Sequence, residues 1–307
     1  MADEDSPAGR VQQLISWAAT VVAPLSLLTA VLFYFGYASS RAQYEYFGVD
    51  VDTIGLSTQD YVMRSPQPLL TPLLVLVLLA VAVATTHDAV RRRVHAAAAG
   101  SADPDAGVAA RAEDRLAHLH RRFRGLELGG YALIVAGTLM LLGYPVLRAW
   151  PLYPMATPLV MGLGAALALY GGRVRGMLRP DERPLLGVVL ALALVLVVDA
   201  FWATATLAQW SGRGSAHEIA RHLDRLPTVV VDTRERLGPR SPNVEETLLP
   251  RSTAQTFHYR YRGLHLLVQG KDRLFLVPGT WSPSSFTLVL PMDGAVRLQF
   301  QFENEQP

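Results

Sequence analysis

One acidic residue, Asp199, lies in the middle of a long apolar run of this 307-residue sequence. Its neighbours, Leu196–Val198 and Ala200–Trp202, are apolar. An ionised carboxylate at that depth in lipid costs roughly 2.5–3.5 kcal/mol, so Asp199 must be protonated, face other helices or meet water. Thr206 follows seven residues later on the same helical face. Two hypotheses stay open: a protonatable or cation-attracting transport site, or a structural Asp that hydrogen-bonds to a hydroxyl such as Thr138.

Two arginines near the C-terminus are candidates for contact with an anionic partner. Arg260 and Arg262 alternate with Tyr259 and Tyr261, which places both arginines on one face of a half-buried strand. Such a face suits lipid phosphates or an acidic wall polymer. A solvated strand face is the alternative.

No catalytic, metal or cofactor site is predicted. The chain has no cysteine, which excludes thiol chemistry and cysteine-based metal centres. The four histidines of the C-terminal region form no metal-ligand pattern, and Asp50-Val51-Asp52 has no catalytic domain around it. With a net charge of only +2, no nucleic-acid partner is expected. We therefore expect a protein that is not an enzyme.

The elements that carry these residues are predicted from the apolar runs. Half of the residues are hydrophobic and only 18% are charged, against roughly 25% in soluble domains. Five runs approach or exceed the roughly 20 residues that cross a bilayer as a helix. They cover 14–37, 69–86, 128–147, 155–172 and 185–210. The sequence thus predicts a cytoplasmic tail at 1–13, a five-helix transmembrane region at 14–210 and an extracytoplasmic domain at 211–307.

The arginines predict the orientation. Eight lie in the connection 87–127 and four in the connection 171–184, against two and one in the alternate connections. Short loops rich in arginine stay in the cytoplasm. The N-terminus is then inside, the C-terminal domain outside, and the location the cell membrane. The first run exceeds a signal-peptide core, so we expect it to be retained.

Small residues and an amphipathic stretch predict packing within and beside the bundle. Ala132/Ala136, Gly162/Ala166 and Gly164/Ala168 have the spacing that lets helices approach closely. In the cytoplasmic connection, one apolar helical face is formed by Ala112, Leu116, Leu119 and Phe123. Flanked by arginines, this helix suits the anionic inner leaflet. Docking to a cytosolic partner is the alternative.

The C-terminal region is predicted to be a small α+β domain. A capping box at Ser215–Glu218 opens a helix to Leu226, and Thr228–Asp232 is a β-branched strand. The stretch 234–252 is expected to be a surface loop. Further strands are predicted at 257–262, 264–268, 273–277, 286–290 and 295–302. A Gly270–Asp272 turn joins the middle pair, and Asp293-Gly294 predicts a hairpin between the last two.

Several short segments carry a family resemblance. Tyr46–Asp50, Leu56–Tyr61, Thr228–Thr233 and Tyr259–Val268 resemble segments of uncharacterised actinobacterial multi-pass membrane proteins. The resemblance implies a bacterial cytoplasmic-membrane location and brings no known activity or site residues.

The function expected from the sequence is that of an envelope sensor, scaffold or accessory subunit with an outer binding domain. Its partners are the lipid bilayer and another membrane or envelope protein. The alternative is a transporter or channel component that uses Asp199. The sequence leaves the oligomeric state open.

Overall fold

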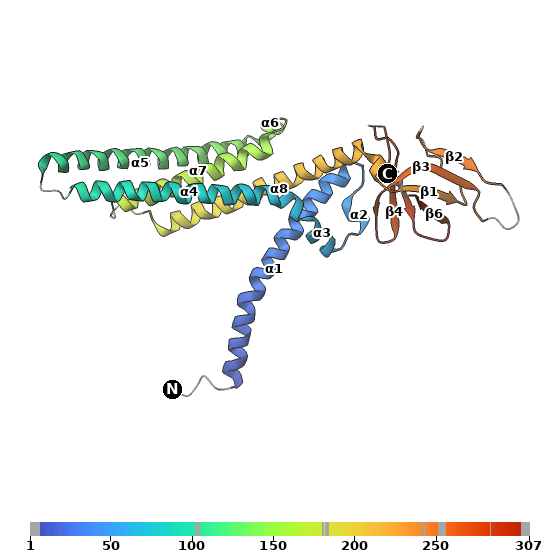
Figure 1. The fold of residues 1–307 in the computed structure, drawn as a ribbon, viewed down its shortest axis with the longest axis horizontal. Helices are drawn as coiled ribbons and strands as arrows, with labels where there is room; N and C mark the ends of the chain where they lie inside the picture. Colours follow the sequence, from blue (N-terminus) through green and yellow to red (C-terminus); the bar gives the residue numbers. More distant parts are fainter. Residues whose placement is uncertain are drawn as a thin grey trace, which may run out of the picture. The chain divides into compact units, whose positions relative to one another are not determined.

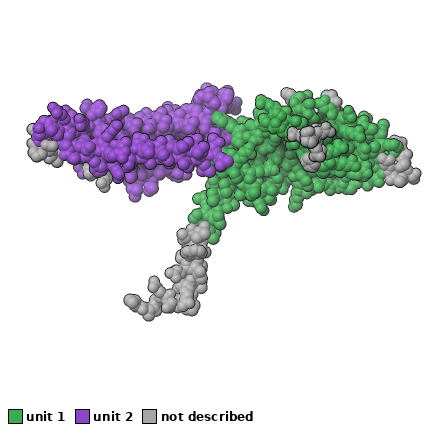
Figure 2. Space-filling model, in the orientation of Figure 1, with its two compact units in different colours: residues 1–69, 208–307 green, residues 70–207 purple. Residues whose placement is uncertain are grey.

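The computed structural model describes residues 7–101, 105–179, 181, 184–239, 241, 243–250, 256–282 and 284–301, with 7–21, 101 and 106 in their backbone only. Residues 1–6, Arg183 and Phe302, which belong to predicted segments, lie outside the described residues. The chain divides into two compact units, residues 1–69 with 208–307 and residues 70–207 (Figure 2). Each unit is described by itself below.

Five of the helices are long and apolar enough to cross a membrane, as predicted. They are α1 (Pro7–Glu45), α4 (Pro66–Ser101), α5 (Ala106–Leu142), α7 (Tyr153–Leu178) and α8 (Leu186–Arg221), drawn in Figure 1. Three short helices lie between them, α2 (Val51–Ile54), α3 (Thr58–Arg64) and α6 (Tyr144–Leu147). At 1.5 Å per residue, the 36 residues of α4 exceed a hydrocarbon core of about 30 Å by more than half.

In residues 70–207, α7 packs against α5 and α8 through small residues. A Cβ on Gly130 of α5 would lie 2.6 Å from the Gly164 carbonyl oxygen and the Ala168 nitrogen of α7. The predicted pair Gly164/Ala168 is therefore a close-contact face. The predicted pair Ala132/Ala136 is not, because both residues are exposed on the other side of α5.

The predicted membrane-surface helix is not a separate element. Residues 112–123 lie inside α5, and the two ends of their apolar face are buried within the chain. A Cβ on Gly100 would lie 3.3 Å from the Cβ of Ala112, and the Phe123 ring lies 6.1 Å from that of Tyr170. Both ends of this face therefore pack on other helices, whereas Leu116 and Leu119 between them are half-buried.

The first unit contains a six-stranded antiparallel sheet of order β5-β4-β3-β1-β6, with β2 beside β3. The strands are β1 (Thr228–Thr233), β2 (Glu245–Leu248), β3 (Tyr259–Gln269), β4 (Arg273–Pro278), β5 (Leu288–Pro291) and β6 (Val296–Gln301). The β3–β4 turn is confirmed, and the strands predicted at 257–262 and 264–268 form the single strand β3, which bulges at Gly263 (φ 81°).

Three expectations for this unit are wrong. The strands β5 and β6 lie at opposite ends of the sheet order, so Asp293-Gly294 is not a hairpin. The predicted helix at 215–226 is the end of α8, which continues through Ser215 without a break and stops at Arg221. The predicted loop 234–252 contains β2.

Strand β4 is buried on both faces, and this explains why the first unit includes residues far from the sheet in sequence. Leu274 and Leu276 pack with β1 and β3 residues on one face. Phe275 and Val277 face a second cluster, whose other members come mostly from the connection after α1. These are Tyr44, Phe47, Val49, Val51, Ile54, Tyr61, Ala216, Leu223 and Val268. The connection after α1 and the C-terminal sheet thus share one hydrophobic core.

Candidate functional site

A groove of about 920 Å³ opens in the first unit, beside this shared core. One wall comes from the end of α1 and the segment after it, and the other from β4, β5 and the loop between them. Its lining residues are Glu45, Tyr46, Phe47, Gly48, Val49, Asp50, Thr53, Phe275, Trp281, Ser282, Ser285, Phe286, Thr287 and Val289. This volume is typical of small-molecule sites.

A tight turn positions the first wall. Where α1 ends, the Phe47 and Val49 amides donate to the Tyr44 carbonyl oxygen at 2.9 and 3.0 Å. Gly48 adopts φ 70°, a left-handed conformation that glycine enters without steric cost. Asp50 then caps α2 by accepting a hydrogen bond from the Asp52 amide at 3.1 Å. The turn thus places residues 45–50 along the groove.

A hydrogen bond and an aromatic cluster hold the second wall against the first. The Thr287 hydroxyl donates to the Phe47 carbonyl oxygen at 2.6 Å. The Trp281 ring centroid lies 4.9 Å from that of Phe47 and 6.4 Å from that of Tyr46. The Ser285 hydroxyl accepts a hydrogen bond from the Ser282 amide at 2.9 Å. The groove is therefore built by two segments more than 200 residues apart in sequence.

The groove is acidic and aromatic. Glu45 and Asp50 are both exposed, and the described lining contains no arginine, lysine or histidine. Phe47 and Phe275 are buried, and Tyr46, Trp281 and Phe286 keep part of their surface accessible. Sequence reasoning singled out none of these residues as a site. Two features of the sequence could have indicated the groove. The run Leu274–Val277 is continuously apolar, which is typical of a strand buried on both faces, and the aromatic segment Tyr44–Phe47 could supply the residues that bury one of them.

Asp199, the first residue that the sequence singled out, is buried between α8 and α7. Only 4% of its surface is exposed, and a Cβ on Gly162 would lie 3.3 Å from its Cβ. Its Oδ2 has no hydrogen-bond partner among the described residues. The suggested partner Thr138 is exposed and donates to the Ile134 carbonyl oxygen of its own helix. A buried carboxylate oxygen without a partner requires an explanation, such as a proton or a water molecule.

Thr206, predicted on the same face, has a structural partner instead. Its hydroxyl lies 3.3 Å from the Pro154 carbonyl oxygen and 3.1 Å from the Trp202 carbonyl oxygen. Pro158 has no amide hydrogen to donate to Pro154, so the Pro154 carbonyl lacks its helical donor. The single Thr206 hydroxyl hydrogen is in reach of this carbonyl across the α7–α8 contact and of the Trp202 carbonyl in its own helix.

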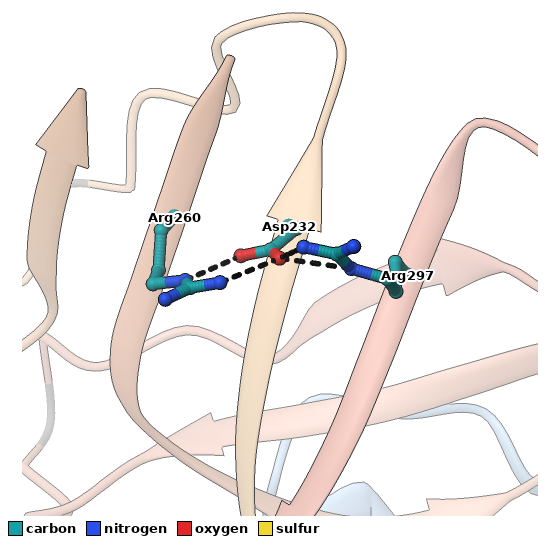
Figure 3. Close-up of polar contacts among 3 residues, drawn as sticks. All are labelled: Asp232, Arg260 and Arg297. Carbon is teal, nitrogen blue, oxygen red and sulfur yellow. Dashed lines mark hydrogen bonds and ion pairs between the residues drawn. The ribbon is translucent and has the colours of Figure 1, made fainter. Parts of the chain in front are cut away.

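Arg260 and Arg262, predicted as one basic face, differ in their contacts. Arg260 donates to both carboxylate oxygens of Asp232, at 2.8 and 3.0 Å (Figure 3). Arg297 binds the same carboxylate from the other side, with Nε 3.0 Å from Oδ2. Asp232 is 1% exposed and lies on β1, which pairs with β3 and β6. Arg262 is exposed and lies opposite Glu245 in the β2–β3 register.

The two guanidinium groups determine the charge of Asp232. Their hydrogen bonds, that of Arg260 first, hold the pKa of the Asp232 carboxyl below its usual value, against the opposite effect of burial. In turn, the carboxylate raises the pKa of Arg260. This Arg–Asp–Arg cluster joins three strands, which is a structural use of Arg260.

Sequence reasoning missed a buried ion pair in residues 70–207. Glu127 of α5 and Arg175 of α7 approach to 3.1 Å, with side chains 10% and 19% exposed. Gly171 makes room for the pair, because a Cβ there would lie 2.9 Å from the Glu127 Cβ. The available signals were the adjacent glycines Gly171 and Gly172, close to Arg175, and the position of Glu127 directly before an apolar run.

Within the described parts of the chain, no three His, Asp or Glu side chains are grouped to hold a metal ion. Comparison with known proteins gives no match to a family model, a curated protein or a solved structure. The site is therefore interpreted from its own geometry.

Proposed function

We propose that this chain is a membrane-anchored binding protein of the cell membrane, whose outer unit takes a ligand in the groove between residues 45–53 and 281–289. The observation that carries the proposal is the construction of the groove. Its two walls are fixed by a shared core and by the hydrogen bond from Thr287 to Phe47. An accessory subunit or envelope sensor needs such a preformed site outside the bilayer.

The packing of the first unit supports the proposed orientation. Residues 46–68 and the C-terminal sheet share one core, so both lie on the same side of any membrane that the helices cross. Four apolar helices separate these two segments, an even number that returns the chain to the same side. The arginine-rich connections favour the opposite side as the cytoplasmic one. The N-terminus is then inside and the groove outside.

Crosslinking in living cells tests the binding role. A photoreactive amino acid replaces Ser282, which is exposed on the groove, and in a matched strain replaces Glu235, which is exposed elsewhere in the same unit. We expect the Ser282 position alone to capture a reproducible envelope component or small molecule. Equal capture at both positions, or capture at neither, would contradict the proposal.

Asp199 supports a second candidate function, a proton or cation pathway through the bundle. The supporting observation is its buried Oδ2 beside Gly162, for which the described residues provide no hydrogen-bond partner. Protein in liposomes should then pass protons or cations, and Asp199→Asn should abolish this flux. The control is Asp88→Asn, which changes an exposed carboxylate that pairs with Arg91 and Arg92. Absence of flux in the unchanged protein would refute this candidate.

A further inference from the structure

We infer that the groove of the outer unit selects a small organic cation, a molecule with a protonated or quaternary amine and an apolar part. The inference rests on the proposed binding role and names the ligand class for the same groove. It follows from charge, aromatic lining and size, each considered in turn.

The charge of the groove is negative from three sources. Glu45 and Asp50 contribute one carboxylate each, and the described lining contains no basic side chain. Glu45 is also the last residue of α1, where the helix dipole places roughly half a negative charge. A cation is therefore attracted and an anion is repelled, because the described lining holds no positive charge that offsets the carboxylates.

The aromatic rings add an attraction that is specific to organic cations. Tyr46 and Trp281 both contact Phe47, with interplanar angles of 85° and 65°. Phe47 itself is buried, whereas the Tyr46 and Trp281 rings that pack on it keep part of their surface accessible along the groove. The face of an aromatic ring attracts a quaternary ammonium group, whereas the water shell of a hydrated metal ion weakens the same attraction. The lining thus favours an amine over a simple inorganic cation.

The source of the cation is a free molecule and not a lipid headgroup. The zwitterionic lipids that carry an amine also carry a phosphate beside it. A phosphate would be repelled by Glu45 and Asp50, and the described lining has no arginine or lysine to pair with it. A volume of about 920 Å³ holds a complete small molecule.

Calorimetric titration of the purified full-length protein in a non-ionic detergent tests the inference. The probes are choline, its neutral isostere with carbon in place of the quaternary nitrogen, and phosphocholine. We expect choline to bind at least about tenfold more tightly than either of the others, a difference of roughly 1.4 kcal/mol. Equal binding of the neutral isostere overturns the cation selectivity, and tighter binding of phosphocholine overturns the free-molecule source.

Variants of the groove connect any binding to the named residues. The double change Glu45→Gln and Asp50→Asn should weaken choline about tenfold, and asparagine keeps the N-cap of α2. Trp281→Leu should weaken it about fivefold. Glu235→Gln, the control outside the groove, should have no effect. If the groove variants bind as the unchanged protein does, the site is elsewhere and the inference fails.

The inference and the proposed function can fail separately. If none of the three probes binds, yet crosslinking from position 282 captures a component that position 235 does not, the organic-cation inference is overturned and the binding role stands. If position 282 captures nothing and no probe binds, both are overturned.

Discussion

The cluster of Asp232 with Arg260 and Arg297 leads to the sharpest prediction for stability. The change is Asp232→Ala, which removes the carboxylate and leaves two guanidinium groups on adjacent strands (Figure 3). The matched control is Asp272→Ala. Asp272 also binds an arginine through two hydrogen bonds, at 2.8 and 2.9 Å to Arg273, but its side chain is 67% exposed.

The magnitude follows from burial. Removing one partner of a buried ion pair costs roughly 3–5 kcal/mol. The Asp232 side chain is 1% exposed, but Arg260 and Arg297 are 25% and 48% exposed and regain water, so the lower end applies, about 3 kcal/mol. The exposed pair of Asp272 is screened by water, so its loss should have a much smaller effect.

Hydrogen exchange of the full-length protein, followed by mass spectrometry on peptides that cover β1, measures the effect. A loss of about 3 kcal/mol speeds the exchange of these amides by about two orders of magnitude. Adding Arg260→Met to Asp232→Ala should recover part of the loss, because it removes one of the two unpaired charges. If Asp232→Ala and Asp272→Ala have equal effects, or if the changes at 232 and 260 simply add, the reasoning is refuted.

The same cluster predicts a pH dependence. The folded protein holds the pKa of Asp232 below the value of about 4 for an unfolded aspartate. Its stabilisation is therefore fully present above that pH and is lost as the pH falls through the lowered pKa. Protection of β1 in the unchanged protein should decline with acid in this range, and the Asp232→Asn variant should lack this part of the decline.

Three further substitutions test the packing. Gly164→Val places a side chain 2.7 Å from the Gly130 carbonyl oxygen, so it should lower the free energy of unfolding by about 3 kcal/mol or separate α5 from α7. The control Ala136→Val, on the exposed face of α5, should change stability little. Thermal unfolding in detergent compares the two variants. Thr206→Val removes the hydroxyl that bridges α8 and α7 and should lower stability by about 0.6 kcal/mol in the same assay. Gly263→Ala introduces a Cβ at positive φ that meets the backbone of Asn243. Gly238→Ala also has a positive φ, but no described atom lies within 4 Å of its Cβ. The clash should therefore make Gly263→Ala about 1 kcal/mol or more costlier than Gly238→Ala, and exchange of the β3 amides measures both.

Much of the helical architecture could be predicted from hydropathy, but the helix ends could not. Apolar runs report which residues prefer lipid, so all five long helices were found. The helices continue where lipid preference stops, because residues such as Ala96–Ala99 and Arg91–Arg93 are good helix formers in water. For the same reason no new helix begins at the capping sequence of Ser215, because α8 continues through this residue.

The sheet shows where local signals fail. Asp293-Gly294 has the chemistry of a tight hairpin, yet β6 pairs with β1 and not with β5. That pairing places Val231 opposite Leu298 and Val229 opposite Phe300. Such cross-strand apolar pairs stabilise a sheet, and they depend on partners 60 or more residues away. The residues of a turn therefore cannot predict which strands pair.

The groove depends on a similar long-range contact. The sequence showed an aromatic, weakly acidic connection after the first span and a separate C-terminal domain. No pattern in the sequence around either residue indicates that Phe47 and Phe275 belong to one core. Asp199, in contrast, was found from the sequence because a carboxylate within an apolar run is informative without any knowledge of its contacts.

The central claim is that the connection after α1 and the C-terminal sheet form one outer unit, on the side of the membrane opposite the arginine-rich connections. Labelling of introduced cysteines tests this claim most directly. The chain has no native cysteine, so Gln59→Cys, Lys271→Cys and Arg92→Cys each give one reporter at an exposed position. A thiol reagent that cannot cross membranes should label positions 59 and 271 in intact cells, and position 92 only after the membrane is opened. Labelling of position 92 in intact cells, with positions 59 and 271 protected, would contradict the account.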